Sequence, residues 1–76
     1  MTNTIHVERA KKRMSQEKLA KAIGVHRQTI FAIESKKYMP NGVLMLKLAE
    51  YFKVPVEDIF KLEDSDREKI KGMVKM

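Results

Sequence analysis

A single glycine between two helix-forming segments constrains this chain more than any other feature of its sequence. Residues 16–23 carry apolar positions at helical spacing, with Ser15 as an N-cap before them and Gly24 as the residue that ends the helix. After two bridging residues, a second helical pattern runs from Arg27 to Ser35. Two helices cross near a right angle over so short a turn when a small residue lies at their contact, glycine lies in the turn and apolar residues flank it. The positions that meet these requirements are Leu19, Ala20, Ile23, Gly24, Val25, Ile30 and Ile33.

The rest of the chain predicts an all-α fold in one domain. The stretch 5–7 alternates apolar and polar residues and is either an edge strand or a lead-in to a helix. Further helices are expected over 8–14, from a cap at Asn41 to about Phe52, and over 56–60 after Pro55. We therefore expect five helices in a domain over residues 1–64. Residues 65–76 form a charged tail that is helical or frayed.

Length and composition limit the function classes. A chain of 76 residues without cysteine has to draw its core from an apolar fraction of 43%, or to borrow surface from a second copy. It has no apolar run near the roughly 18 residues of a membrane span and no signal-peptide pattern at residues 1–4, so a cytoplasmic protein without a membrane partner is expected. Little room remains for a pocket, and the chain has two histidines, no metal-ligand cluster and no glycine-rich phosphate loop. We therefore expect neither an enzyme nor a cofactor, metal or small-molecule site.

The net charge of +6 lies entirely in the first half of the chain. Residues 8–37 contain nine basic and three acidic residues, whereas residues 38–76 contain seven of each. Such an asymmetry favours a polyanionic partner, either nucleic acid or an anionic membrane surface. The alternative interpretation from charge alone is a solvated positive face that keeps the protein soluble.

Several short motifs together resemble those of a known family. They are Ser-Gln-Glu-Lys-Leu-Ala over 15–20, Gly-Val-His-Arg-Gln-Thr-Ile over 24–30, Ala-Ile-Glu over 32–34, Lys-Tyr over 37–38, Pro40, Leu-Lys-Leu-Ala over 46–49 and Val-Glu-Asp-Ile-Phe over 56–60. Across residues 5–60 the sequence resembles the XRE-type helix-turn-helix domain of phage Cro and cI repressors, and in particular small stand-alone bacterial regulators such as the cytolysin repressor. The resemblance implies a five-helix phage-repressor-like fold, a short two-stranded terminal sheet, a homodimer and double-stranded DNA as the partner.

By this resemblance, the helix that begins near Arg27 is the recognition helix. At about 100° per residue, one face of it carries Arg27, Gln28, Phe31, Ala32 and Ser35. In the major groove, Arg27 can bond to O6 and N7 of guanine and Gln28 to N6 and N7 of adenine. Phe31 and Ala32 can meet thymine methyl groups. The alternative is that Arg27 and Gln28 are merely exposed and that Phe31 packs back on the core.

The resemblance also implies a set of contacts to DNA phosphates, which position a protein without reading sequence. Gln16, at the start of the preceding helix, would hold a phosphate and brace the recognition helix. The loop of Lys36, Lys37 and Tyr38 would lie against the backbone. His26 stands where the family usually has a Ser or Thr cap, and its imidazole and the Thr29 hydroxyl are further candidates.

Other residues are expected to have structural roles. The resemblance pairs Arg9 with Glu34 in an ion pair that ties the first helix to the recognition helix, with phosphate binding as the alternative for Arg9. Met14, Met39 and Met45 are interpreted as core residues rather than as a ligand site.

A second copy of the chain is the expected protein partner. One such domain makes few base contacts, and two copies would read half-sites about 34 Å apart, which implies a palindromic operator. The resemblance pairs residues 5–7 with 60–62 in an antiparallel sheet beside the interface. The residues assigned to the interface are Ile5, Val7, Phe52, Val56, Ile59, Phe60 and Leu62. The alternative is that these residues form a monomeric core.

Taken together, the sequence predicts a homodimeric, sequence-specific transcriptional regulator that binds double-stranded DNA and acts as a repressor. The alternative from another class is a protein-interaction module, such as an antitoxin-like partner that neutralises a second protein. An enzyme is the third and most distant candidate, because no nucleophile and base occur at a meaningful spacing.

Overall fold

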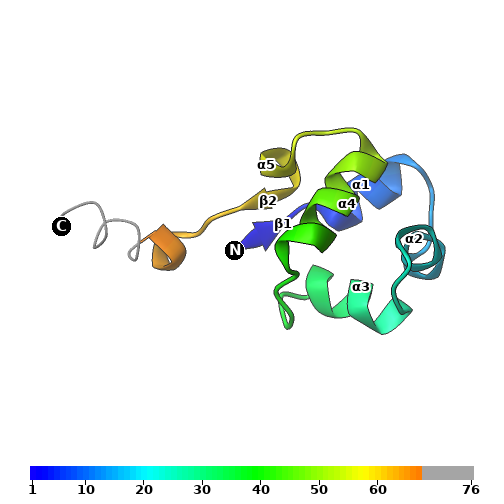
Figure 1. Ribbon diagram of the computed structural model, residues 1–76, viewed down its shortest axis with the longest axis horizontal. Helices are drawn as coiled ribbons and strands as arrows, with labels where there is room; N and C mark the ends of the chain where they lie inside the picture. Colours follow the sequence, from blue (N-terminus) through cyan, green and yellow to red (C-terminus); the bar gives the residue numbers. More distant parts are fainter. Residues whose placement is uncertain (68–76) are drawn as a thin grey trace.

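Helices account for most of residues 1–67, the part of the chain that this computed structural model describes (Figure 1). In chain order the elements are β1 (Thr2–Asn3), α1 (Ile5–Lys11), α2 (Gln16–Ile23), α3 (Arg27–Glu34), α4 (Gly42–Phe52), α5 (Val56–Ile59) and β2 (Phe60–Lys61). Residues 64–67 are helical as well. The expected mostly helical fold with a small terminal sheet is confirmed. Within residues 1–67, no helix has the length and apolar character needed to cross a membrane.

The paired helices α2 and α3 form as the sequence predicts. The Ser15 hydroxyl caps α2 by accepting a hydrogen bond from the Lys18 amide at 3.0 Å. Gly24 ends it in the left-handed region, with φ of 87°, and donates its amide to Ala20 O at 2.8 Å. Because Ala20 is small and buried, α3 can pack closely against α2. This local chemistry fixes the angle at which α3 leaves the turn.

The core lies between α4 and the other helices. The residues buried completely or nearly so are Ile5, Leu19, Ile30, Ile33, Leu48 and Ile59, and each of α1 to α5 contributes at least one of them. In Figure 1, α4 runs through the middle of the molecule, with α2 to one side, α3 below and α5 above. Burying an aliphatic side chain of this size stabilises the fold by about 1.5–3 kcal/mol. The core therefore holds α3 firmly by one side only, through Ile30 and Ile33.

The terminal sheet differs from its predicted position. Residues 5–7 do not form a strand and do not pair with 60–62; they form the first turn of α1. The N-terminal strand is β1, which is antiparallel to β2 with Thr2 opposite Lys61 and Asn3 opposite Phe60. The reason is a set of long-range bonds just before the helix. Asn3 Nδ2 donates to Ile33 O at 2.9 Å and the Thr4 amide donates to Ile59 O at 2.9 Å, so the chain turns there.

Other boundaries shift by a few residues. The first helix spans 5–11 instead of 8–14, and the last short helix ends at Ile59 instead of 60. The fourth helix, α4, begins at Gly42, because Asn41 caps it through a 2.8 Å bond from the Leu44 amide. The tail assigned to 65–76 is described only to residue 67, and 68–76 lie outside the described residues.

Burial corrects two sets of assignments. Met39, expected in the core, is 64% exposed, whereas Met14 is buried as expected and Met45 is half-buried. Of the residues assigned to the dimer interface, four are core residues of the single chain: Ile5, Phe52, Ile59 and Phe60. They pack inside the domain and are at most 6% exposed. The remaining three, Val7, Val56 and Leu62, are exposed or half-buried.

Candidate nucleic-acid interface

The outer face of α3 is polar and open to solvent. Ile30 and Ile33 are buried against the core, whereas Arg27, Gln28 and Phe31 on the other side are exposed. Figure 1 shows α3 along the lower edge of the molecule, where no other helix covers it. A two-turn helix that is anchored on one side and uncovered on the other has the shape needed to enter a DNA groove.

A chain of polar contacts braces one flank of α3. Arg9 holds Glu34 through two bonds, from Nε to Oε2 at 2.7 Å and from Nη2 to Oε1 at 3.0 Å. Gln16 Nε2 donates to Glu34 Oε1 at 3.2 Å, and Arg27 Nη1 lies 3.5 Å from Gln16 Oε1. The hydrogen bond with Glu34 raises the pKa of Arg9 further above its usual high value. Arg9 and Glu34 thus form the expected ion pair, and Gln16 links that pair to the first residue of α3.

Phe31 lies on the outer face and does not pack back on the core. Its side chain is 48% exposed, and the Lys37 ammonium lies 5.9 Å from the ring centroid. This distance is within the range of a cation–π contact. Phe31 and Lys37 therefore place an apolar surface and a positive charge next to each other, beside Gln28.

The loop after α3 is held close to it by backbone bonds. The amides of Lys37 and Tyr38 both donate to Ala32 O, at 2.8 and 3.2 Å, and Lys36 takes a left-handed conformation with φ of 65°. Lys37 and Tyr38 are exposed beside the helix. Lys36 Nζ, in contrast, pairs with Glu63 Oε1 at 2.9 Å and is directed toward the segment after β2.

The N-terminal end of α3 has a weak cap. His26 has the backbone conformation of an N-cap, with φ of −83° and ψ of 153°, but its side chain makes no capping hydrogen bond. His26 is exposed, and Thr29 one turn later is half-buried. Both side chains lie at the same end of α3 as Arg27 and Gln28.

The comparisons with known proteins agree with this geometry. A family model described as helix-turn-helix matches residues 5–59. The chain belongs to the helix-turn-helix family. An uncharacterized HTH-type transcriptional regulator of Methanocaldococcus jannaschii is 48% identical over 66 residues, which are 87% of this chain and 100% of that relative. The HTH-type transcriptional regulator YgzD of Bacillus subtilis is 42% identical over 66 residues, which are again 87% of this chain and 100% of that relative. The resemblance stated from the motifs is thereby confirmed, and the family supports DNA-binding transcription regulation, a class that is not enzymatic.

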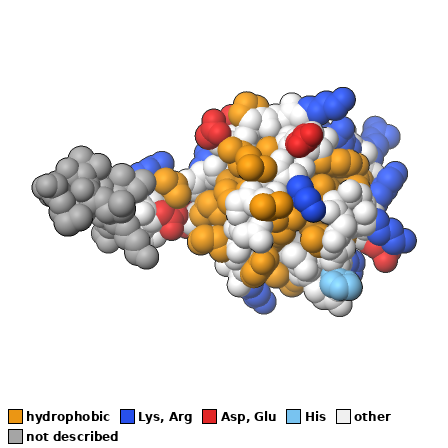
Figure 2. All heavy atoms as spheres, viewed as in Figure 1, with side chains coloured by type: hydrophobic (Ala, Val, Ile, Leu, Met, Phe, Trp, Pro, Cys, Tyr) orange, Lys and Arg blue, Asp and Glu red, His pale blue; other side chains and the backbone are white. Residues whose placement is uncertain are grey.

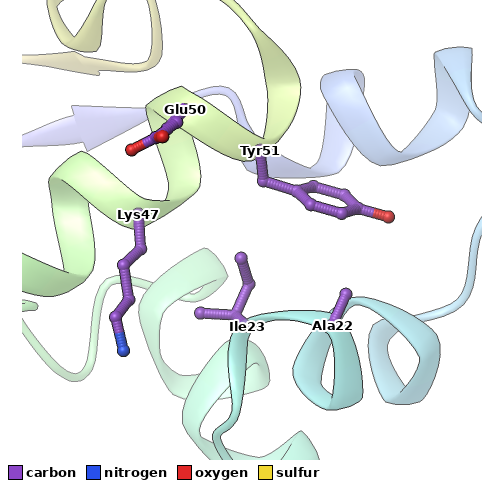
Figure 3. A pocket seen from close by; sticks show the side chains of 5 residues that line it. All are labelled: Ala22, Ile23, Lys47, Glu50 and Tyr51. Carbon is purple, nitrogen blue, oxygen red and sulfur yellow. The ribbon is translucent and has the colours of Figure 1, made fainter.

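Two features of this helix-turn-helix protein were missed by the sequence analysis, and both involve α4. Lys47 lines two surface hollows, one of about 330 Å³ between α3 and α4 and one of about 230 Å³ between α2 and α4. Figure 3 shows the second, with the Lys47 side chain extending away from Glu50 and Tyr51. The sequence signal was present, because Lys47 is the single basic residue in α4, whose other residues are apolar apart from Glu50, Tyr51 and the first glycine.

The second missed feature is the apolar surface that α4 and the loop before it expose. Met39, Val43 and Leu46 are exposed, and Figure 2 shows apolar side chains gathered over the middle of this face. Lys and Arg side chains are concentrated at the edge next to α2. Among residues 1–67, no group of three His, Cys, Asp or Glu side chains is placed to hold a metal ion.

Proposed function

We propose that this helix-turn-helix protein is a sequence-specific, double-stranded DNA-binding transcriptional regulator that acts as a homodimeric repressor. The observation that carries the proposal is the exposed face of α3, which presents Arg27, Gln28 and Phe31 while Ile30 and Ile33 anchor it from behind. Repression would follow from occupying an operator that overlaps a promoter and excluding the polymerase.

Each residue on this face has a chemical role in base recognition. The Arg27 guanidinium can donate two bonds to O6 and N7 of guanine, and the Gln28 amide can pair with N6 and N7 of adenine. Phe31 and Ala32 offer apolar surface to thymine methyl groups. The brace through Gln16, Glu34 and Arg9 restricts the Arg27 side chain before DNA arrives, so less side-chain entropy is lost on binding.

The proposed phosphate contacts lie on either side of this face. Gln16 flanks α3 on the side of α2, and Lys37 and Tyr38 flank it in the following loop. His26 and Thr29 are candidates at the N-terminal end of α3. Lys36 would contribute only after it exchanges Glu63 for a phosphate. These contacts would set the orientation of α3 in the groove and make binding sensitive to salt.

The homodimer is supported by the size of α3 and by exposed apolar surface. A helix of eight residues reaches few base pairs, so two copies about 34 Å apart would be needed to select a unique palindromic site. Of the interface residues expected from the sequence, Val7, Val56 and Leu62 remain accessible. The exposed Met39 and Leu46 add apolar area of the kind that symmetric interfaces bury.

Selection from a pool of random duplex DNA tests the proposal. The wild-type protein should enrich a palindrome, and Arg27→Ala and Gln28→Ala should each lose about 1–3 kcal/mol for that sequence and relax specificity at one base position in each half-site. Lys53→Ala is the control, because it removes one positive charge after the last turn of α4, away from α3.

The opposite outcome distinguishes the alternative function. If Arg27 and Gln28 are dispensable and no sequence is enriched, the protein is not an operator-binding regulator. Loss of function on changing Met39, Val43 and Leu46 would then favour a protein-interaction module of the antitoxin type, since those exposed apolar residues could bind a second protein. Size-exclusion chromatography with light scattering tests the dimer separately, and a monomer at all concentrations would refute it.

A further inference from the structure

We propose that the hollow between α3 and α4 binds one sugar–phosphate unit of the DNA backbone, with Lys47 as its charged residue. This inference rests on the proposed function and extends it, since it adds a phosphate site that belongs to α4. The hollow has a volume of about 330 Å³. The residues that line it and carry the argument are Val25, Thr29, Tyr38, Asn41, Val43 and Lys47.

The hollow opens onto the base-reading face of α3. Thr29 and Tyr38 also line an adjoining hollow of about 300 Å³, whose other walls are Gln28 and Ala32. The two hollows therefore lie next to each other on the flank of α3, with Thr29 and Tyr38 bordering both. A strand whose bases meet Gln28 and Ala32 would carry its backbone into the part lined by Lys47.

The polar groups of the hollow are suited to an anion. Asn41 Oδ1 already accepts the Leu44 amide at 2.8 Å, so the group that Asn41 can offer to a ligand is its amide NH2, a donor. The hydroxyls of Thr29 and Tyr38 can also donate, and the Lys47 ammonium supplies three donors and a positive charge. No Asp or Glu lines this hollow among the described residues. Donors with one positive charge match a phosphodiester, which has one negative charge.

The apolar walls fit the remainder of a nucleotide backbone. Val25 and Val43 lie beside the polar groups in the same hollow. A deoxyribose has an apolar carbon surface next to its phosphate, and it can pack against these side chains while the phosphate meets the donors. This mixture of walls favours a backbone unit over a free inorganic anion.

Lys47 is available for this role. It is exposed on α4, and the ion pairs formed within residues 1–67 do not involve it. Gln16 lies on the opposite flank of α3, beside Arg27 and Glu34. Contacts from Gln16 on one flank and Lys47 on the other would hold α3 between the two backbones of a major groove, which is about 12 Å wide. Lys47 is thus a positioning residue and reads no base.

A salt titration with matched lysine variants tests the inference. The probe is the duplex that the wild-type protein enriches from a random pool, compared with an unselected duplex of the same length. Lys47→Gln should weaken binding to both duplexes by a similar factor, several-fold at moderate salt. It should also reduce the slope of log affinity against log salt by about 0.9 per protomer. Lys53→Gln, with the same loss of charge just after the last residue of α4, should leave the slope within experimental error of wild type.

Two further variants separate the charge from the other donors. Thr29→Val and Tyr38→Phe each remove a neutral hydroxyl, so they should weaken binding without changing the salt slope. Lys47→Arg keeps the charge and should keep most of the affinity. Thermal unfolding of each variant establishes that the fold is retained, as expected at exposed or half-buried positions.

Neutral methylphosphonate substitutions then locate the contact. Replacing one phosphate that flanks each half-site should remove the difference in DNA affinity between wild type and Lys47→Gln. The same replacement at other phosphates should preserve that difference. The inference would be overturned if Lys47→Gln and Lys53→Gln changed the salt slope equally, or if methylphosphonate substitution lowered the affinity equally at every phosphate. The proposed function would remain intact in either case. If the wild-type protein enriches no duplex and Gln28→Ala has no effect, the proposed function fails and this inference fails with it.

Discussion

Arg9 and Glu34 join the first helix to α3 through two parallel bonds, from Nε to Oε2 at 2.7 Å and from Nη2 to Oε1 at 3.0 Å. The two side chains are only 18% and 10% exposed. Arg9 uses its third nitrogen to donate to Met14 O at 2.9 Å, and Glu34 Oε1 also accepts from Gln16 at 3.2 Å. One guanidinium thus ties together α1, the turn before α2 and the end of α3, and such two-bond geometry between charged groups is stronger than an exposed pair.

Removing either partner should therefore destabilise the domain. Arg9→Met leaves Glu34 poorly solvated and without its charge partner, and Glu34→Met does the same to Arg9. We expect each single variant to lose about 1–3 kcal/mol of unfolding free energy in urea titrations. The double variant should lose clearly less than the sum of the two, because it leaves no unpaired charge. Strictly additive losses would show that the two residues act independently.

The helix pair and its brace were predictable because their determinants are local or lie in recognisable motifs. Ser15, Ala20 and Gly24 each meet a steric or hydrogen-bonding requirement that can be stated from sequence spacing alone. The structure places all three as required. The pairing of Arg9 with Glu34 followed from the family resemblance instead, since a separation of 25 residues gives no local signal.

The features that were predicted wrongly depend on long-range contacts. Residues 5–7 are too short to distinguish a strand from the start of a helix, and bonds from Asn3 to Ile33 and from Thr4 to Ile59 decide the matter. Nearly every side of α4 is apolar, so its sequence cannot tell the exposed Val43 and Leu46 from the buried Leu44 and Leu48. The hollow beside Lys47 was likewise unpredictable, because it exists only where α3 and α4 come together.

Replacing His26 should improve the cap of α3. Its backbone, with φ of −83° and ψ of 153°, closely matches that of Ser15, with φ of −76° and ψ of 165°, yet its side chain makes no capping bond. The Thr29 amide already donates to His26 O at 2.9 Å, so a serine hydroxyl there would accept mainly from the Gln28 amide, and His26→Ser should stabilise the protein by about 0.5–1 kcal/mol. Ser15→Ala is the reference, with an expected loss of about 1 kcal/mol. Calorimetry measures both, and a His26→Ser variant no more stable than wild type would contradict the prediction.

Two glycines should respond to alanine in opposite directions. A Cβ at either Gly24 or Gly42 would meet no atom within 4 Å, so no clash contributes at either site. Gly24 has φ of 87°, and Gly24→Ala should cost about 1–2 kcal/mol from backbone strain alone. Gly24→Asn should cost less, because asparagine tolerates this conformation better. Gly42 is the first residue of α4, and Gly42→Ala should stabilise by about 0.4–1 kcal/mol. Urea unfolding of the three variants tests the order, and a stabilising Gly24→Ala would contradict it.

The carboxylates of Glu63 and Asp66, which lie beside the Met1 ammonium, should make the free energy of unfolding depend on pH. The Met1 ammonium lies 2.6 Å from Glu63 Oε2 and 2.7 Å from Asp66 Oδ2, and its hydrogen bonds lower the pKa of both carboxyl groups. A carboxyl group with a lowered pKa in the folded state stabilises the fold above its unfolded pKa, and this contribution is lost as the pH falls through the folded pKa. Asp66→Asn should therefore be less stable than wild type near neutral pH, and the difference should shrink below about pH 4, the usual pKa of Asp.

The same interaction should also weaken on the alkaline side. Hydrogen bonds with Asp66 and Glu63 raise the pKa of the Met1 ammonium from 8.0. The contribution of a group with a raised pKa is complete below its unfolded pKa and is lost as the pH rises through the folded one. The difference in unfolding free energy between wild type and Asp66→Asn should thus be largest between two pH ranges. In the lower range the carboxyl groups become protonated, and in the upper range the Met1 ammonium loses its proton. Asp64→Asn is the control, because the one ion pair that Asp64 forms among residues 1–67 is with the exposed Arg67, at 3.2 Å. A difference for Asp66→Asn that stays constant from acid to alkaline pH would show that the carboxylate does not act through this ion pair.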